Sequence, residues 1–352
     1  MIVVGGGPGG VSAAVCCARQ GFNVLLMEKG ERGRHKPCGG VLPLVAPDII
    51  EQILGRDIPP EVSAYPPQLG LTYVPPSGLT NGGRMHGYEV HNIDRDAFDK
   101  WLIDLARDEG VSVMFSTRFI SLEQTDDILV ACEVEGHPCL FRTRFVVGAD
   151  GARSSVRRVL FPQCQFNLMI VGQETWHGDG NYESDFYVLF DRHISPACSY
   201  LIPKDGKVIV GTGVLSGSRM NITASLRMLR EWLEREGLLI CRERLNNERW
   251  SIPIGPTIYG TENVLLVGDA AGLCNPLSGE GIRPAIESGE MAALAIAAHL
   301  RDGSSVLSTY ISAADGLSSM VEELRRFVMG ADNTVREEFV KSELKRRLLP
   351  RS

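Results

Sequence analysis

Long apolar segments are missing from this chain of 352 residues. A transmembrane helix needs a run of about 18 apolar residues or more, and no run reaches that length. The Ala-rich stretch at residues 291–300 is too short. The apolar start at residues 1–4 turns to glycine too early for a secretory signal. We therefore expect no membrane-spanning helix.

Paired cysteines are missing as well. The chain has 9 cysteines, an odd number, and none are spaced as C-x-x-C. A disulfide framework or a zinc site is therefore not expected, and a reducing cytoplasm is the natural compartment. Four histidines also show no metal-ligand spacing, namely His86, His91, His177 and His193. We assign no metal site.

Positive charge is in deficit. Lys and Arg number 36 against 43 Asp and Glu, which gives a net charge of −7. This balance argues against nucleic-acid binding over the whole surface, so we expect no nucleic-acid partner. Hydrophobic residues make up 44% and charged residues 22%, as in ordinary globular proteins. A disordered chain, a collagen and a coiled-coil rod are excluded.

The N-terminus carries the pattern of a dinucleotide-binding unit. A short β-branched run at residues 2–4 precedes a glycine turn, a helical run at 11–19 and a buried-strand pattern that ends in Glu28. Gly5, Gly7 and Gly10 fill the spacing GxGxxG. Because strand, turn, helix, second strand and acid all fall in register, this pattern favours a Rossmann-like unit over an isolated glycine-rich turn.

Each part of this pattern has a role in binding a dinucleotide. Gly5 permits the tight turn, Gly7 lets a pyrophosphate approach the backbone, and Gly10 lets the helix pack on the strand. The helix N-terminus offers free N–H groups to the phosphates. Glu28 is expected to accept hydrogen bonds from the ribose hydroxyls. We include two neighbours in this site, Pro8 and Lys29.

Two later segments resemble further parts of a nucleotide site. Residues 144–151 form a buried strand followed by a turn that contains Asp150. Residues 263–271 form another buried strand, which ends in Gly268-Asp269 and runs through a turn into a long apolar helix. A carboxylate beside several backbone N–H groups suits a ribityl chain and a pyrophosphate. The alternative is that Asp269 only caps a helix.

The three segments together resemble the FAD flavoproteins that include aromatic hydroxylases, flavin halogenases and geranylgeranyl reductases. The resemblance covers most of the chain. It implies an α/β fold, in which a Rossmann-like FAD-binding domain has an inserted β-rich substrate domain and a helical C-terminal tail. It also implies that FAD is the cofactor. The acid of the Gly-Asp motif would bind the ribityl chain, and the following helix would point its N-terminus at the flavin.

Two segments are most similar to the geranylgeranyl reductase family. The Pro-Cys-Gly-Gly sequence at residues 37–40 matches a family motif beside the flavin, and residues 279–282 match its G-E-G-I loop. Hydroxylases more often place His where this chain has Gly272. Arg95 belongs to a helix start that both groups place near the cofactor. The resemblance thus adds cofactor contacts at Cys38, Gly39, Gly40, Arg95, Gly279, Gly281 and Ile282.

The chain departs from the family in the stretch that lines the substrate cavity. The family pattern P-x-x-Y-x-W-x-F-P becomes Pro196-Ala-Cys198-Ser-Tyr200-Leu-Ile202-Pro203 here. The frame survives, but the family aromatics are replaced by Cys198, Tyr200 and Ile202. Tyr200 and Pro203 are expected at the substrate cavity, while the identity of the substrate is left open.

The motifs and patterns divide the chain into three parts. The FAD-binding domain is predicted from residues 1–64, 93–162 and 255–310, and the substrate domain from 65–92 and 163–254. Helices are predicted at 96–110 and 219–236. The C-terminal segment 311–352 is expected to be helical from residue 318. Its basic end from Lys341 onward is either a solvated helix or a surface that contacts anionic lipid at the inner face of the membrane.

Cys38 is interpreted as the one cysteine in a turn, flanked by proline and glycines. Backbone geometry rather than core packing would then place its thiol, and basic residues upstream at 29–36 could lower its pKa. We interpret it as a catalytic residue that faces the flavin or the substrate. The alternative is that Cys38 is a small residue in a tight loop.

The leading hypothesis is an FAD-dependent reductase of C=C bonds in a prenyl or similar apolar lipid. Because no second GxGxxG follows the first, the reductant would be external, either NAD(P)H or a ferredoxin-like protein. The first alternative is a monooxygenase or a halogenase on the same fold. The second is a flavin-binding protein without catalytic activity.

Overall fold

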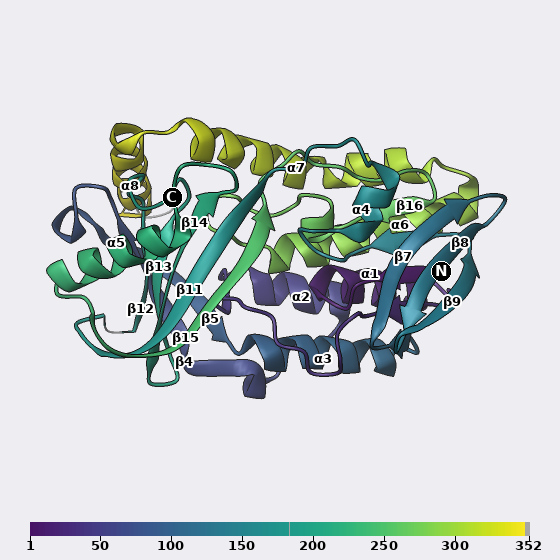
Figure 1. Cartoon of the computed structure of the whole chain (residues 1–352), viewed down its shortest axis with the longest axis horizontal. Coiled ribbons are helices and arrows are strands. Elements are labelled where there is room, and N and C mark those ends of the chain that lie inside the picture. Colours follow the sequence, from purple (N-terminus) through teal and green to yellow (C-terminus); the bar gives the residue numbers. More distant parts are fainter. Residues whose placement is uncertain (183, 349–352) are drawn as a thin grey trace.

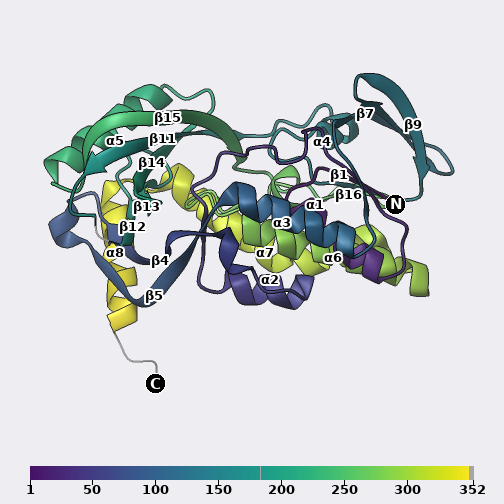
Figure 2. The same cartoon turned by 90° about the horizontal axis from the view of Figure 1, so that it is seen from below.

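The computed structural model describes residues 1–182 and 184–348, with the side chains at 347 and 348 left out. Figures 1 and 2 show an elongated molecule with a large curved sheet at one end and a helix-covered sheet at the other. The α/β fold class predicted from the sequence is confirmed. Within the described residues, no helix is long and apolar enough to cross a membrane.

A five-stranded parallel sheet forms the nucleotide-binding end. Its order is β16 (Val264–Leu266), β10 (Val146–Gly148), β1 (Ile2–Val4), β2 (Leu25–Met27) and β6 (Ser112–Met114). Three of these strands are buried along their whole length, namely β1, β10 and β16. Helices cover both faces of most parallel sheets, which explains the continuous apolar runs in the sequence.

Helices around this sheet pack on one another. The pairs in contact include α1 (Pro8–Arg19) with α6 (Ile282–Asp302), α1 with α3 (Arg95–Asp108), α2 (Ala46–Leu54) with α6, and α6 with α7 (Val306–Gly330). Gly9 lies against the backbone of Ala285, and Gly289 lies against the backbone of Gly9. A side chain at either glycine would push α1 and α6 apart.

The large sheet has eight strands and is antiparallel except where β12 pairs with β4. Its order is β15 (Ile240–Pro253), β11 (Leu168–Asp179), β14 (Lys207–Leu215), β13 (Ser199–Lys204), β12 (Asp185–Leu189), β4 (Ser63–Val74), β5 (Gly83–Ile93) and β3 (Val41–Leu42). Helix α5 (Ile222–Arg235) contacts β14, β11 and β15. We keep the predicted domain boundaries as a proposal.

Smaller elements complete the chain. A three-stranded sheet contains β7 (Thr117–Gln124), β8 (Ile128–Val134) and β9 (His137–Thr143), and α4 (Ser155–Leu160) contacts β7. Short 3₁₀ helices are η1 (Pro60–Val62), η2 (Leu79–Asn81) and η3 (Gly268–Ala270). The last helix, α8 (Asn333–Leu348), contacts β4 and β5 of the large sheet.

The predicted helices are confirmed with shifted ends. The helix predicted at 96–110 is α3, and the one predicted at 219–236 is α5. The predicted helical start at residue 318 is wrong, because α7 already begins at Val306. Ser305 caps α7, since its hydroxyl oxygen accepts a hydrogen bond from the backbone N–H of Ser308 at 3.1 Å.

Candidate functional site

The glycine turn after β1 is shaped for a close backbone approach. Gly5 has φ +108°, and a Cβ there would overlap the backbone of Ala149. A Cβ on Gly10 would overlap the carbonyl oxygen of Gly5, so only glycine lets α1 start this close to the strand. Gly7 is the N-cap of α1 and has open space on its side-chain side. No side chain of the described residues caps the helix, which leaves its first backbone N–H groups available to a ligand.

Glu28 stands at the end of β2 in a small cleft. Its carboxylate is buried and accepts hydrogen bonds from the backbone N–H of Gly6 and of Gly30, both at 2.8 Å. Arg34 lies beside it, with Nε 3.2 Å from Glu28 Oε1, and reaches Asp99 at 3.7 Å. Glu28, Arg34 and Asp99 all line this small cleft. A carboxylate and a guanidinium at such a place can bind a ribose and a nearby phosphate.

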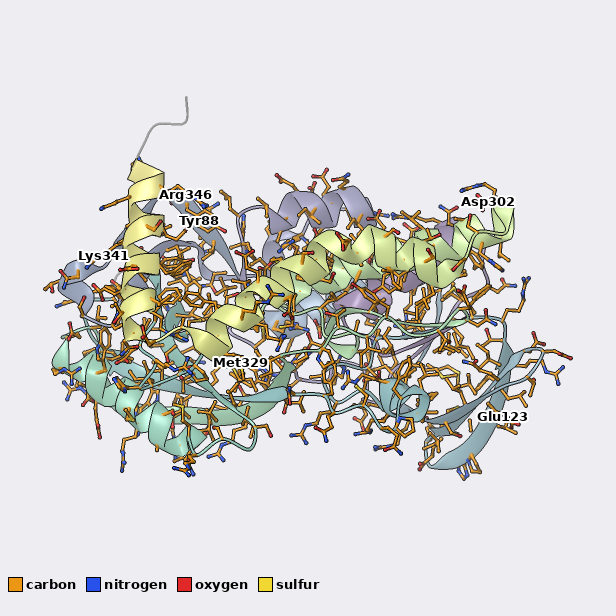
Figure 3. The ribbon with its side chains drawn as sticks, turned by 90° about the horizontal axis from the view of Figure 1, so that it is seen from above. Tyr88, Glu123, Asp302, Met329, Lys341 and Arg346 are labelled. Carbon is orange, nitrogen blue, oxygen red and sulfur yellow. The ribbon has the colours of Figure 1, made fainter. Side chains whose placement is uncertain are left out.

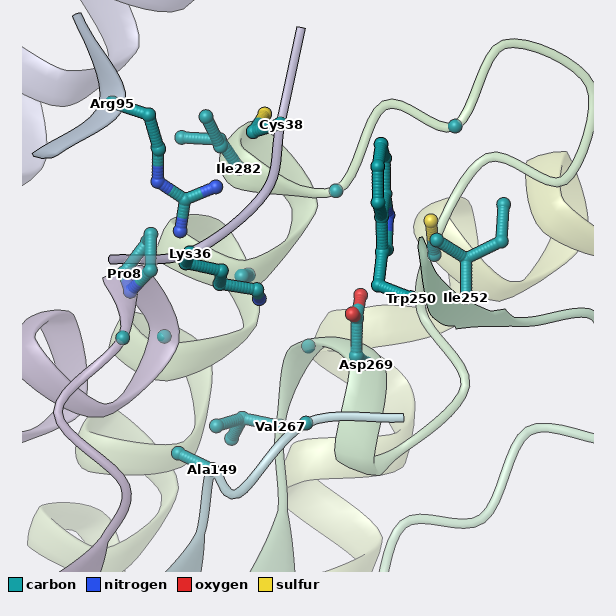
Figure 4. Close-up of a pocket in the computed structure, with 18 of the residues that line it drawn as sticks. Pro8, Lys36, Cys38, Arg95, Ala149, Trp250, Ile252, Val267, Asp269 and Ile282 are labelled. Atoms are coloured by element: carbon teal, nitrogen blue, oxygen red, sulfur yellow. The ribbon is translucent and has the colours of Figure 1, made fainter. Parts of the chain in front are cut away.

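A second cleft lies between the glycine turn and the end of β16 (Figure 4). Asp269 points into it from η3, while Arg95 and Lys36 point into it from the opposite side. No described residue donates a hydrogen bond to the Asp269 carboxylate, which caps no helix. The alternative prediction of a helix cap is therefore wrong. Gly281 is the N-cap of α6 without a side-chain cap, so these helical N–H groups also face the cleft.

Arg95 is the buried cation of this cleft. It is 9% exposed, and its guanidinium donates to Asp99 at 2.7 and 3.3 Å. Burial opposes the charge, but Asp99 and the Cys38 thiol beside it raise the pKa of Arg95 above its ordinary value. The family resemblance predicted this arginine near the cofactor, and Arg95 lines the second cleft together with Cys38.

An apolar cavity of about 450 Å³ adjoins the cleft on the face of the large sheet. The two spaces share Cys38, Trp250, Ile252 and Gly279. Tyr200 lines the cavity, as expected from the sequence. Its other walls come mainly from apolar side chains of the large sheet and the C-terminal helices, among them Leu71, Val90, Met169, Val188, Phe190, Leu324 and Phe339.

Lys204 braces the Cys38 loop, which we define as residues 36–40. Its ammonium group donates to the carbonyl oxygens of Ile93 at 2.6 Å and Gly40 at 3.3 Å. Burial lowers the pKa of Lys204 to about 8. This contact could not be predicted from the sequence, because Lys204 lies on a strand far along the chain from Gly40 and Ile93. Gly39 and Gly40 of the loop line the cavity.

Some expected contacts lie away from these spaces. Lys29 is exposed and lines neither cleft, and Pro203 does not line the cavity, although its carbonyl accepts from Asn92 at 3.1 Å. Asp150 lines neither cleft. It accepts from the backbone N–H of Ser155 and of Val156, and its Oδ1 is buried with no partner among the described residues.

Six of the remaining predicted contacts surround the second cleft. Its lining includes Gly7, Pro8, Gly268, Gly279, Gly281 and Ile282. The interpretation of Cys38 as the one cysteine in a turn is wrong. Cys274 lies at a bend between elements and lines the second cleft, and Cys164 also lies outside helices and strands. Of the upstream basic residues, Lys36 shares the cleft with Cys38, whereas Arg34 pairs with Glu28.

Known proteins are similar in sequence to this chain. A family model described as an FAD binding domain matches residues 1–211. The chain is 32% identical over 313 residues to geranylgeranyl diphosphate reductase of Rhodobacter capsulatus, covering 86% of this chain and 75% of that protein.

Solved structures support the same fold. A geranylgeranyl bacteriochlorophyll reductase-like protein from Thermoplasma acidophilum matches with a TM-score of 0.80 at 19% identity, covering 99% of this chain and 94% of that chain. The p-nitrophenol 4-monooxygenase of Pseudomonas putida matches with a TM-score of 0.69 at 17% identity, covering 99% and 96%.

The two clefts fit an extended dinucleotide. Two uncapped helix N-termini face the second cleft, at Gly7 and Gly281, and suit the pyrophosphate. Glu28 is placed for the adenosine ribose, and Asp269 has an unused carboxylate for the ribityl chain. These features and the relatives agree, so the chain belongs to the geranylgeranyl reductase family of FAD-dependent oxidoreductases, and its cofactor is FAD.

Proposed function

We propose that the protein reduces C=C bonds of a prenyl or similar apolar lipid. The observation that carries this proposal is the apolar cavity of about 450 Å³, which adjoins the cofactor cleft at Cys38, Trp250, Ile252 and Gly279. A reduced flavin supplies a hydride when it is bound. The cavity would hold the alkene against the cleft and keep water away from it.

The charges in the cavity favour an uncharged ligand. Arg283 is the one cation among its described lining residues, and its guanidinium donates to Glu280 at 2.6 Å and Glu287 at 2.9 Å. A cation paired with two carboxylates has little attraction left for a phosphate. We therefore propose that the lipid tail fills the cavity, and that any charged headgroup lies outside it.

The residues proposed to contact FAD divide between the two clefts. Glu28 serves the adenosine half in the first cleft, and the glycine turn, Arg95 and Asp269 serve the pyrophosphate and ribityl chain in the second. We retain Cys38 as a catalytic residue because it borders both the second cleft and the cavity. The reductant is proposed to be external, either NAD(P)H or a ferredoxin-like protein.

The proposal of a membrane contact rests on the basic end of the chain, from Lys341 onward. Figure 3 shows Lys341 and Arg346 on α8. Lys341 pairs with Glu337 at 3.2 Å and Arg346 with Glu343 at 3.4 Å, which supports a solvated helix more than a lipid-binding face. The last two basic residues of this end, Arg347 and Arg351, have side chains outside the described part of the chain.

An anaerobic reoxidation experiment tests the proposed function. The FAD-loaded protein is reduced by light without oxygen and then mixed with polyprenyl lipids or with air. Reoxidation by lipid, with a saturated product, supports the reductase. A hydroxylated product formed with air would support the monooxygenase, a fold neighbour of this chain. Reoxidation that no lipid accelerates, with no oxygenated product, would support a protein that binds flavin without turnover.

A further inference from the structure

A row of polar side chains crosses the large sheet. The register places Tyr200 on β13 opposite Gly211 on β14, Gly211 opposite Gln173 on β11, and Gln173 opposite Glu248 on β15. Residues directly opposite one another on neighbouring strands share a face of the sheet. Val171 stands two positions from Gln173 on the same strand, so it shares this face, and Val171 lines the cavity.

Because Gly211 has no side chain, the Tyr200 ring occupies the space beside it. A Cβ on Gly211 would overlap the ring and the hydroxyl of Tyr200, so the ring lies over the glycine backbone. From there the Tyr200 hydroxyl donates to Gln173 Oε1 at 3.0 Å. Burial raises the pKa of Tyr200 well above its ordinary value. The hydroxyl therefore keeps its proton at neutral pH.

The outer part of the row fixes which way Gln173 points. The Gln173 amide nitrogen lies 3.5 Å from Glu248 Oε2, and the other oxygen of Glu248 lies 2.6 Å from His35 Nε2. An ionised carboxylate only accepts hydrogen bonds. Glu248 therefore accepts a hydrogen bond from the amide nitrogen of Gln173. The amide oxygen of Gln173 then points toward the Tyr200 hydroxyl.

The position of Tyr200 relative to the cofactor side completes the argument. The Tyr200 ring lies close to Gly39, at 4.0 Å from where a Cβ would stand on that glycine. Gly39 belongs to the Cys38 loop, which borders both the cavity and the cofactor cleft. Tyr200 thus offers a protonated hydroxyl on the wall of an apolar cavity, near the place where the cleft opens.

We propose that Tyr200 is the proton donor to the alkene and that Gln173 and Glu248 are positioning residues. This role rests on the proposed function. The alkene would take a hydride at one carbon from a reduced flavin bound in the cleft. Its π electron pair then forms the second C–H bond with the proton of Tyr200, which turns from Gln173 Oε1 toward the alkene as the O–H bond breaks. The phenolate left on Tyr200 regains a proton from water when the product leaves.

The test compares Tyr200→Phe with wild type and with Tyr182→Phe, a matched variant outside the cavity. Lipid binding, flavin photoreduction and reoxidation of the reduced protein by lipid are measured separately. We expect Tyr200→Phe to bind FAD and lipid as wild type does and to be reduced normally. Reoxidation by lipid should be slower by about 100-fold, because a positioned general acid contributes about 10²–10⁴-fold. Wild type should slow in D₂O, and Tyr200→Phe should lose that isotope effect.

The outcomes separate this role from the proposed function. A wild-type protein that no polyprenyl lipid reoxidises would overturn the proposed function and the role of Tyr200 with it. A wild-type protein that is reoxidised by lipid, beside a Tyr200→Phe variant with the same rate and isotope effect, would overturn the role alone. Loss of lipid binding in Tyr200→Phe would also overturn it, since the hydroxyl would then serve binding and not protonation.

Discussion

At the scale of single residues, Asp269 is the sharpest test of the cofactor site. Its carboxylate has no hydrogen-bond donor among the described residues, so removing it costs the fold little. Asp269→Ala should weaken FAD binding by about tenfold to a hundredfold, since hydrogen bonds to charged groups contribute about 1.5–3 kcal/mol. Flavin titration and thermal melting measure the two effects on one sample.

Asp315→Ala is the control for this variant, because Asp315 is exposed on α7. It should leave both FAD affinity and the melting temperature unchanged. Normal FAD affinity in Asp269→Ala would contradict the placement of the ribityl chain at this carboxylate.

Cys38 gives a second prediction at this scale. If Tyr200 provides the proton, the Cys38 thiol acts on substrate placement in the space between cleft and cavity. Cys38→Ser should bind FAD and be reduced normally, yet be reoxidised slowly by lipid or leave some double bonds unsaturated. Cys38→Ala should perform better than Cys38→Ser, because it keeps the space apolar. Rates and product patterns equal to wild type in both variants would make Cys38 a packing residue.

At the scale of elements, the turn between β1 and α1 depends on a missing side chain. Gly10→Ala should destabilise the protein by about 1–3 kcal/mol, because its Cβ would overlap the Gly5 carbonyl oxygen and push α1 away from the strand. The matched control is Gly316→Ala in α7, where a Cβ meets nothing. That change should stabilise by about 0.5–1 kcal/mol. Chemical denaturation compares them, and equal effects would contradict the close packing at Gly10.

His35 joins two elements, α3 and β15, in a way that depends on pH. Its ring nitrogens lie 2.7 Å from Asp96 on α3 and 2.6 Å from Glu248 on β15. The hydrogen bond with Asp96 raises the pKa of His35 and burial lowers it, and the net result is a raised pKa. A raised pKa stabilises the fold fully below the unfolded value of 6.5. This stabilisation disappears as the pH rises through the folded value.

The expected result is a gap in unfolding free energy between wild type and His35→Gln that is largest at acidic pH and closes toward alkaline pH. The side chain is 56% exposed, so solvent screening keeps the gap small. His193→Gln, at an exposed site, is the control. A gap that grows with pH would contradict a protonated His35 between the two carboxylates.

At the scale of the whole molecule, the sequence predicted those features that short local motifs determine. The glycine turn and the Gly-Asp turn are short contiguous motifs, so the clefts around Gly7 and Asp269 could be predicted without a fold. Contacts that depend on register could not be predicted. Gln173 and Glu248 are 75 positions apart, and Lys204 and Ile93 are 111 apart. Neither pair leaves a periodic signal, because strand order across the large sheet brings them together.

The proposed reductase activity is tested most directly by the product of a single turnover. The FAD-loaded protein is reduced without oxygen and mixed with a polyprenyl lipid, and the lipid is analysed by mass spectrometry. We predict reoxidation of the flavin together with a lipid that gains two hydrogen atoms for each reduced C=C bond, with the cavity of about 450 Å³ as the binding site. A reduced flavin that persists beside an unchanged lipid would contradict the reductase account.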